Sequence, residues 1–170
     1  KISTIFLERR IIKAPVCIFH TQEAVREAFK ADEFTEDTII VVRFPRPQAN
    51  GMPELHGLTP NLSVLRDRGL KVALITDGRI SGASGKVPAA IHIPPEAVND
   101  GPIANLKDWD IVSLDVVHGK IDIMECGFDQ RVVVQLDLFK NQFGTGRELF
   151  SLFRQNATTA SEGGGSFKFF

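Results

Sequence analysis

The stretch LKVALITDGRISGASGKVPAAIHIPPEA, residues 70–97, says most about how this chain folds. Residues 71–76 are apolar and β-branched enough to predict a buried strand, and residues 87–93 predict a return strand. The intervening loop, residues 77–86, is rich in glycine and polar side chains. Loops that follow buried strands often bind ligands, because backbone groups and side chains converge there. Taken alone, however, this composition is more often that of a mobile turn.

Upstream of this stretch, two apolar segments predict further buried strands, residues 14–20 and residues 38–44. Thr21 is expected to cap a helix after the first of them, because the apolar residues that follow share one helical face. After the second strand, three prolines and a glycine in residues 45–53 end regular structure. A second helix is expected beyond this segment, with Thr59 at its N-cap and a proline in its first turn.

Downstream, residues 110–117 and 120–126 flank a His-Gly pair and predict a β-hairpin with a tight turn. Residues 131–139 predict another strand. Thr145 and Glu148 have the spacing of a capping box and predict a short helix after them.

The predicted elements amount to roughly seven strands and three helices, which indicates a β-rich α/β domain rather than a regular doubly wound sheet. We expect one domain over residues 1–155. Residues 156–170 contain the segment SEGGGSF, whose composition is typical of a flexible tail.

The charge balance and the cysteine content narrow the class of protein. The chain has 20 basic and 21 acidic residues, so nothing favours a nucleic-acid partner, which selects for a basic face. No apolar run approaches the ~18 residues that cross a bilayer, and no signal peptide is recognisable. Cys17 and Cys126 are far apart in sequence and lack CxxC spacing, so we expect two reduced thiols in a cytoplasmic protein.

The sequence does not match three common ligand-binding motifs. A P-loop requires glycine where Ile80 stands and Ser or Thr where Val87 stands. A dinucleotide fingerprint near residue 146 fails because Leu149 occupies the third glycine position. The histidines lack zinc-site spacing; they are His20, His56, His92 and His118.

Two segments taken together identify a family. NGMPELHGLTP, residues 50–60, and the stretch 70–97 closely resemble the dihydroxy-acid and sugar-acid dehydratase family. The resemblance runs in order from Ile12 to Phe153. GTGRELF, residues 144–150, is similar to the 6-phosphogluconate dehydratase branch of that family.

The resemblance implies a C-terminal, swivelling β/β/α barrel-like domain with flanking helices. Such a domain closes over an N-terminal domain that holds an iron–sulfur cluster, expected to be 4Fe–4S, and most ligands of a Mg²⁺ ion. Cys17 and Cys126 match none of the cluster cysteines. We therefore expect this chain to be a fragment that is inactive alone, with the N-terminal domain, a second copy in a homodimer and a sugar-acid phosphate as partners.

The resemblance also assigns residues. Glu54 matches the acid that this domain contributes to the Mg²⁺ site, and a carboxylate is a suitable hard ligand. Ser81 matches the proposed base that removes the C2 proton. A serine hydroxyl is too weak an acid to ionise unless nearby metal ions or a cation stabilise the alkoxide, and Arg79 is a candidate cation. Without the resemblance, Glu54 is typical of a first-turn helix acid, and Ser81 of an ordinary loop hydroxyl.

The implied reaction is the dehydration of 6-phosphogluconate to 2-keto-3-deoxy-6-phosphogluconate, a step of the Entner–Doudoroff pathway. For the phosphate we expect the helix start at residues 144–147, where Gly146 and Arg147 offer backbone N–H groups and a guanidinium. The competing interpretation is that Arg147 only docks this helix.

The sequence is also compatible with other functions. The chain also fits a dehydratase of a non-phosphorylated sugar acid or dihydroxy acid, or a non-catalytic module that binds a sugar acid or a protein. Residues 45–47, PRP, depart from the expected glycine-containing turn, and this departure could displace the loop before Glu54. As a fragment, the chain is expected to expose an apolar surface and to self-associate.

Overall fold

A computed structural model of the chain describes residues 10–81 and 86–167. Its centre is one mixed sheet with the strand order β4-β3-β2-β1-β5-β6. The strands β1 to β4 run parallel, whereas β5 is antiparallel to both β1 and β6. The strands span β1 Ile11–Phe19, β2 Thr38–Val42, β3 Val72–Thr76, β4 Ala89–Ala90, β5 Ile111–Asp115 and β6 Lys120–Ile123.

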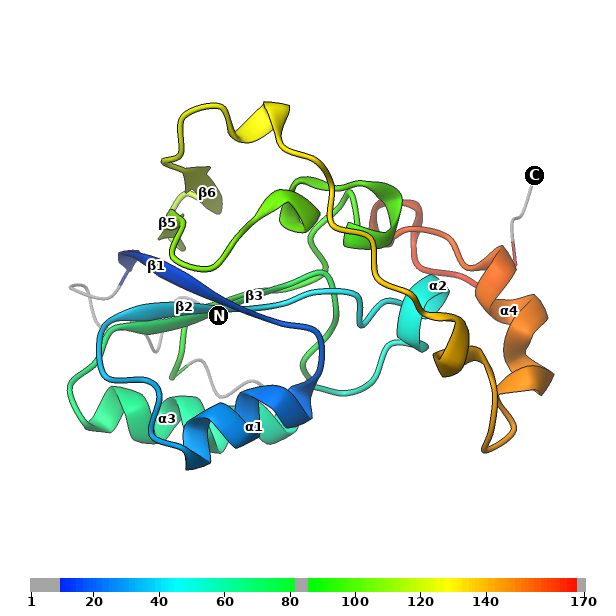
Figure 1. The fold of residues 1–170 in the computed structure, drawn as a ribbon, viewed down its shortest axis with the longest axis horizontal. Coiled ribbons are helices and arrows are strands. Elements are labelled where there is room, and N and C mark those ends of the chain that lie inside the picture. The colour runs from blue at the N-terminus through cyan, green and yellow to red at the C-terminus, as the bar shows by residue number, and fades with distance from the viewer. Residues whose placement is uncertain (1–9, 82–85, 168–170) are drawn as a thin grey trace.

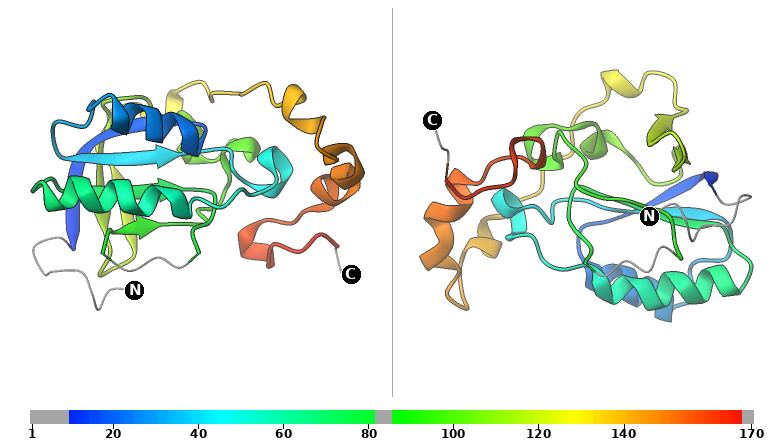
Figure 2. Two further views of the ribbon diagram at one scale, coloured as in Figure 1. Left: turned by 90° about the horizontal axis from the view of Figure 1, so that it is seen from below. Right: turned by 180° about the vertical axis from the view of Figure 1, so that it is seen from behind.

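The α-helices are α1 Gln22–Lys30, α2 Pro47–Asn50, α3 Thr59–Asp67 and α4 Ser151–Asn156. Short 3-10 helices connect them: η3 His56–Leu58, η4 Ala97–Asn99, η5 Pro102–Asn105, η6 Phe128–Gln130, η7 Phe139–Gln142, η8 Arg147–Phe150 and η9 Ala160–Glu162. The helices α1 and α3 lie together on one face of the parallel strands (Figure 1). The helices α2 and α4 contact each other beyond the carboxyl ends of those strands (Figure 2).

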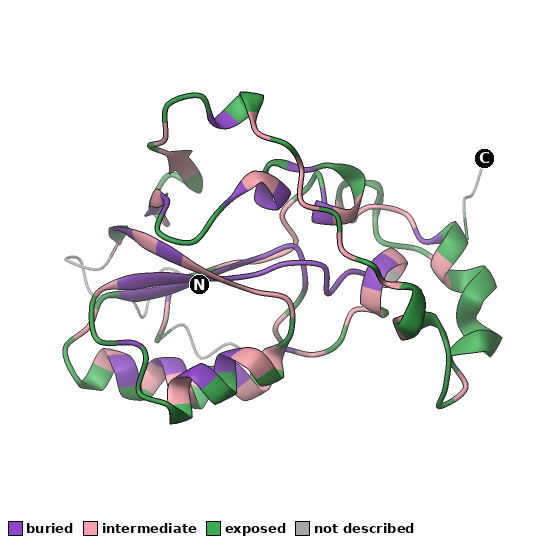
Figure 3. Cartoon of the chain, in the orientation of Figure 1, coloured by how far each residue is buried: buried purple, intermediate pink, exposed green. Residues whose placement is uncertain are grey.

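The central strands β2 and β3 owe their position to continuous apolarity. All their residues are buried (Figure 3). Alternate residues of β2 point to opposite faces: Ile39 and Val41 pack in the cluster that includes η4 and η5, and Ile40 and Val42 pack in the cluster with α1 and α3. Burial of each such side chain contributes about 1.5–3 kcal/mol, so both faces hold the sheet in place.

Most of the sequence-based predictions of fold are confirmed. The chain is a β-rich α/β domain with flanking helices. Thr21 caps α1 through its Oγ1, which accepts the Ala24 N–H at 3.1 Å. The predicted hairpin is β5–β6, with Gly119 at φ 64° in its turn. No helix in the described residues has the length and apolarity to span a membrane.

Two predicted strands are wrong or too long. The segment 131–139 forms no strand; Val133, Leu136 and Leu138 instead pack against the edge of the core. Apolar contacts with the core therefore position this segment, although it does not pair with a strand of the sheet. The predicted strand over residues 87–93 shrinks to Ala89–Ala90, because His92 turns the backbone at φ 56°.

Both predicted caps after residue 58 are also wrong. The helix α3 begins at Thr59 itself and continues directly from η3, so Thr59 does not cap it. The capping box at Thr145 and Glu148 is absent, because the Glu148 Oε1 accepts the Gly144 N–H at 2.7 Å. A capping box forms instead between Thr159 and Glu162. It lies in the segment predicted to be a flexible tail, and the domain boundary at residue 155 stays a prediction.

Candidate functional site

Two loops meet beyond the carboxyl ends of the parallel strands. One loop follows β2 and carries Glu54; the other follows β3 and carries Arg79 and Ser81. A parallel bridge joins Glu54 to Arg79, and the Leu55 N–H donates to the Arg79 carbonyl at 3.3 Å. Three residues that the sequence predicted for the site therefore come together.

The Glu54 carboxylate is the centre of this arrangement. Its Oε1 accepts the Ser81 N–H at 2.7 Å and the His56 N–H at 3.2 Å, and its Oε2 lies 3.2 Å from Arg79 Nη1. The pKa of Glu54 is lowered, first by the backbone hydrogen bond from Ser81, then by the Ser81 side chain, the charge of Arg79 and the His56 N–H. Glu54 is therefore an ionised carboxylate at neutral pH.

Arg79 and His56 fix the two loops around Glu54. The Arg79 Nε donates to the Met52 carbonyl at 3.3 Å, so its guanidinium bridges both loops. The His56 Nδ1 lies 3.1 Å from the Ser81 carbonyl. His56 lies two residues after Glu54 in the segment NGMPELHGLTP, so this segment is the sequence signal that could have placed His56 here. Residues 82–85, the remainder of the predicted binding loop, lie outside the described residues.

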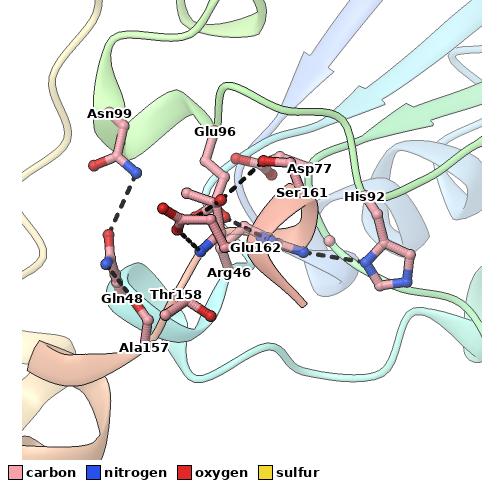
Figure 4. Close-up of polar contacts among 12 residues, drawn as sticks. Arg46, Gln48, Asp77, His92, Glu96, Asn99, Ala157, Thr158, Ser161 and Glu162 are labelled. Atoms are coloured by element: carbon pink, nitrogen blue, oxygen red, sulfur yellow. Dashed lines mark hydrogen bonds and ion pairs between the residues drawn. The ribbon is translucent and has the colours of Figure 1, made fainter. Parts of the chain in front are cut away.

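A buried ion pair lies under the loops, and sequence reasoning missed it (Figure 4). The Arg46 Nη2 lies 2.6 Å from Glu96 Oε1, and each side chain is 2% exposed. The Arg46 Nη1 is 3.1 Å from His92 Nδ1. The Arg46 carbonyl also accepts the N–H groups of three residues that follow it. The buried side chain and the carbonyl of Arg46 therefore hold the Pro-Arg-Pro turn, residues 45–47, in place.

Asp77 joins the bases of both loops. Its side chain is fully buried, and its Oδ2 accepts the Ala97 N–H at 3.0 Å and the Phe44 N–H at 3.4 Å. Burial raises the pKa of Asp77 to about 6. A Cβ atom at Gly78 would lie 2.4 Å from Pro45 Cγ, so the loops pack so closely that only glycine fits there. The Pro-Arg-Pro segment, which departs from the turn expected for the family, therefore packs against the loop that carries Ser81.

Gly146 and Arg147 belong to a different part of the molecule. Gly146 has φ 79°, and Arg147 begins η8, with its Nη1 donating to the Asn141 carbonyl at 2.7 Å. The Gly144 N–H, part of the predicted anion site, is bound by the Glu148 carboxylate. Arg147 lines a cavity of about 290 Å³ that reaches Pro53, the residue before Glu54.

Among the described residues, Glu54 is the candidate Mg²⁺ ligand. No three His, Cys, Asp or Glu side chains converge within residues 10–81 and 86–167. Glu54 offers an ionised carboxylate, the kind of hard ligand that Mg²⁺ prefers, and its Oε2, which pairs with Arg79, has a second lone pair. The chain has only two cysteines, Cys17 and Cys126, both free, too few to hold an iron–sulfur cluster.

Fold and site together define an α/β domain in which the loops that carry Glu54 and Ser81 meet beyond the carboxyl ends of parallel strands. A family model described as "Dihydroxy-acid/6-phosphogluconate dehydratase C-terminal" matches residues 1–164. The chain therefore belongs to the C-terminal domain of the dihydroxy-acid/6-phosphogluconate dehydratase family.

Relatives of known name agree with this assignment. A phosphogluconate dehydratase of Rhizobium meliloti is 52% identical over 96% of this chain and 27% of its own length. One of Pseudomonas aeruginosa is 50% identical over 98% of this chain and 28% of its own. A dihydroxy-acid dehydratase of Acetivibrio thermocellus is 34% identical over 72% of this chain and 22% of its own. The chain thus spans about a quarter of the length of the relatives it matches.

Proposed function

We propose that this chain is the C-terminal part of a hydro-lyase that converts 6-phosphogluconate into 2-keto-3-deoxy-6-phosphogluconate and water. The observation that carries the proposal is the direct hydrogen bonding between Glu54 and Ser81, which come from different loops. The names of the two relatives at 50% and 52% identity support the substrate. The N-terminal part of the same protein is the proposed partner, with a homodimer as the assembly.

In the proposed reaction, Glu54 is a ligand of Mg²⁺ and Ser81 is the base. An iron–sulfur cluster on the N-terminal part and the Mg²⁺, when bound, supply Lewis acids for the C3 hydroxyl and the substrate carboxylate. The Ser81 oxygen takes the C2 proton. The electrons of the C2–H bond form a C2–C3 double bond as the C3–O bond breaks. The departing hydroxide takes up a proton from solvent to become water, and the enol tautomerises to the 2-keto acid. Arg79, which pairs with Glu54, stabilises negative charge beside Ser81.

The alternative is a dehydratase of non-phosphorylated sugar acids or dihydroxy acids. The relative from Acetivibrio thermocellus favours it, although at lower identity and over less of the chain. Substrate comparison separates the two, because only the first proposal requires a site for a phosphate.

The test uses the full-length protein that contains this chain, assayed without oxygen for the 2-keto product. Ser81→Ala is expected to lower kcat by about 10²–10⁴-fold, the usual contribution of a positioned base. Glu54→Gln keeps the side-chain shape but loses the charge, so we expect a Mg²⁺ requirement raised at least about tenfold. Ser63→Ala, on α3, is the matched control and should keep full activity. A Ser81→Ala variant of unchanged kcat would exclude Ser81 as the base.

The chain itself offers a second test. A cluster-loaded N-terminal portion mixed with this chain should regain activity, and Ser81→Ala in the chain should abolish it. Binding of the two parts without turnover would favour the non-catalytic module, and no binding at all would favour a domain that acts alone.

A further inference from the structure

A second cavity lies between α2, η8 and α4, and neither Glu54 nor Ser81 is among the described residues that line it. Its volume is about 440 Å³. The described residues that line it are Asn50, Gly51, Pro53, Asn141, Arg147, Phe150, Phe153, Arg154 and Ser166. These residues include two guanidinium groups, two carboxamides and a hydroxyl, and no carboxylate. The lining is thus suited to an anion that accepts several hydrogen bonds.

Both guanidinium groups are held in place by backbone carbonyls. The Arg147 Nη1 donates to Asn141, and the Arg154 Nη1 donates to the Arg147 carbonyl at 2.8 Å. The Arg154 Nη2 adds a longer bond of 3.4 Å to the Gln142 carbonyl. A guanidinium has five N–H donors, so these bonds orient each group and leave donors for a ligand. A planar fork of this kind suits the paired oxygens of a phosphate.

The wall of the cavity that α2 and η7 form is also fixed. The Asn141 Nδ2 donates to the Asn50 Oδ1 at 2.6 Å, and this bond joins η7 to α2. Gly51, which ends α2 at φ 72°, and Pro53 complete that wall. Two aromatic rings, Phe150 and Phe153, lie 6.1 Å apart between their centroids on the remaining side. Both side chains are also partly exposed to solvent, 58% for Phe150 and 41% for Phe153.

The cavity adjoins the candidate active site through one loop. The 440 Å³ and 290 Å³ cavities share Asn50, Pro53, Asn141 and Arg147, and the smaller one continues to Leu55. Pro53 and Leu55 are the two neighbours of Glu54 in the chain. A ligand with a carboxylate near Glu54 and a second anionic group at its other end would therefore run along this loop.

We propose that Arg147 and Arg154 together bind the phosphate monoester of a phosphorylated sugar acid, and that Arg154 sets the preference for phosphorylated over non-phosphorylated substrates. The proposal rests on the hydro-lyase function assigned to Glu54 and Ser81. Arg154 belongs to α4, which packs against α2 (Figure 2). Gly146, the residue before η8, has φ 79°, and Arg147, which lines the cavity, follows it.

The test compares two ligands in the full-length protein. In a Ser81→Ala background, dissociation constants for 6-phosphogluconate and for gluconate are measured by calorimetry. Arg154→Gln is expected to weaken 6-phosphogluconate binding about 10- to 100-fold, the range for a lost charge-assisted hydrogen bond, and to leave gluconate binding unchanged. Arg154→Lys should restore part of the loss, because it keeps the charge but not the fork.

Lys140→Gln, on η7 and outside the lining of the cavity, removes the same charge from the same surface and is the matched control. Equal weakening by Lys140→Gln and Arg154→Gln would overturn the proposal, because it would show only a general attraction of anions. Unchanged 6-phosphogluconate binding in Arg154→Gln would overturn it as well. Either result leaves the assays of Ser81→Ala and Glu54→Gln to decide the hydro-lyase function separately.

Discussion

At the scale of single residues, Asp77 is the most consequential side chain that the proposed reaction does not use. It is fully buried, and its pKa is raised to about 6 by burial, with Glu96 adding to this effect and Arg46 opposing it. The two N–H groups that Asp77 Oδ2 accepts belong to Phe44 and Ala97, so one carboxyl group holds three segments of chain. Its protonation state is therefore coupled to folding.

The expected consequence is a loss of stability as the pH rises. The pKa of Asp77 in the folded protein exceeds the ordinary value of 3.8. The contribution of Asp77 to the free energy of unfolding is therefore complete below pH 3.8 and is lost as the pH rises through about 6. Two pKa units correspond to roughly 3 kcal/mol. Urea unfolding of wild type and Asp77→Asn between pH 4 and 7 measures the difference, since other groups titrate in both. We expect the free energy of unfolding of Asp77→Asn to rise relative to that of wild type as the pH rises. A difference between the two that stays constant with pH would contradict this.

At the scale of elements, the Arg46–Glu96 pair joins the turn after β2 to the segment before η4. Breaking a buried pair leaves an uncompensated charge, so Glu96→Gln is expected to lower the free energy of unfolding by about 3–5 kcal/mol. Arg68→Gln breaks an exposed ion pair with Asp32 of equal length, 2.6 Å, and should cost less than about 1 kcal/mol. Urea unfolding of both variants checks the contrast, and similar costs for the two would refute it.

The elements also show what the sequence could and could not predict. The strands β2 and β3 were predictable because continuous apolarity is a local signal. The motifs that contain Glu54, Arg79 and Ser81 were recognised by a family resemblance, since their composition alone is typical of ordinary loops. The Arg46–Glu96 pair was not, because two charges fifty residues apart become buried together only through tertiary packing. The segment 131–139 has the apolar content of a strand, but contacts with the core edge decided its conformation.

At the scale of the whole molecule, six of the thirteen exposed large apolar side chains of the described residues lie within residues 139–153. Leu149 is 79% exposed and Leu152 is 63% exposed, and several phenylalanines of the same segment are also exposed. An exposed apolar surface of this kind is a site of association, because its burial removes hydrocarbon from water. The relatives are about four times longer than this chain, so their remaining sequence is available to cover such a surface.

We therefore expect the 170-residue chain to self-associate when it is studied alone. Sedimentation velocity at several concentrations should give a weight-average sedimentation coefficient that rises with concentration. Leu149→Glu combined with Leu152→Glu places charges on the exposed surface of η8 and α4 and should keep the chain monomeric, because association would bury them. Val132→Glu, at an 88% exposed position outside residues 139–153, is the control and should associate like wild type. A wild-type chain that stays monomeric at high concentration would show that this surface does not drive association.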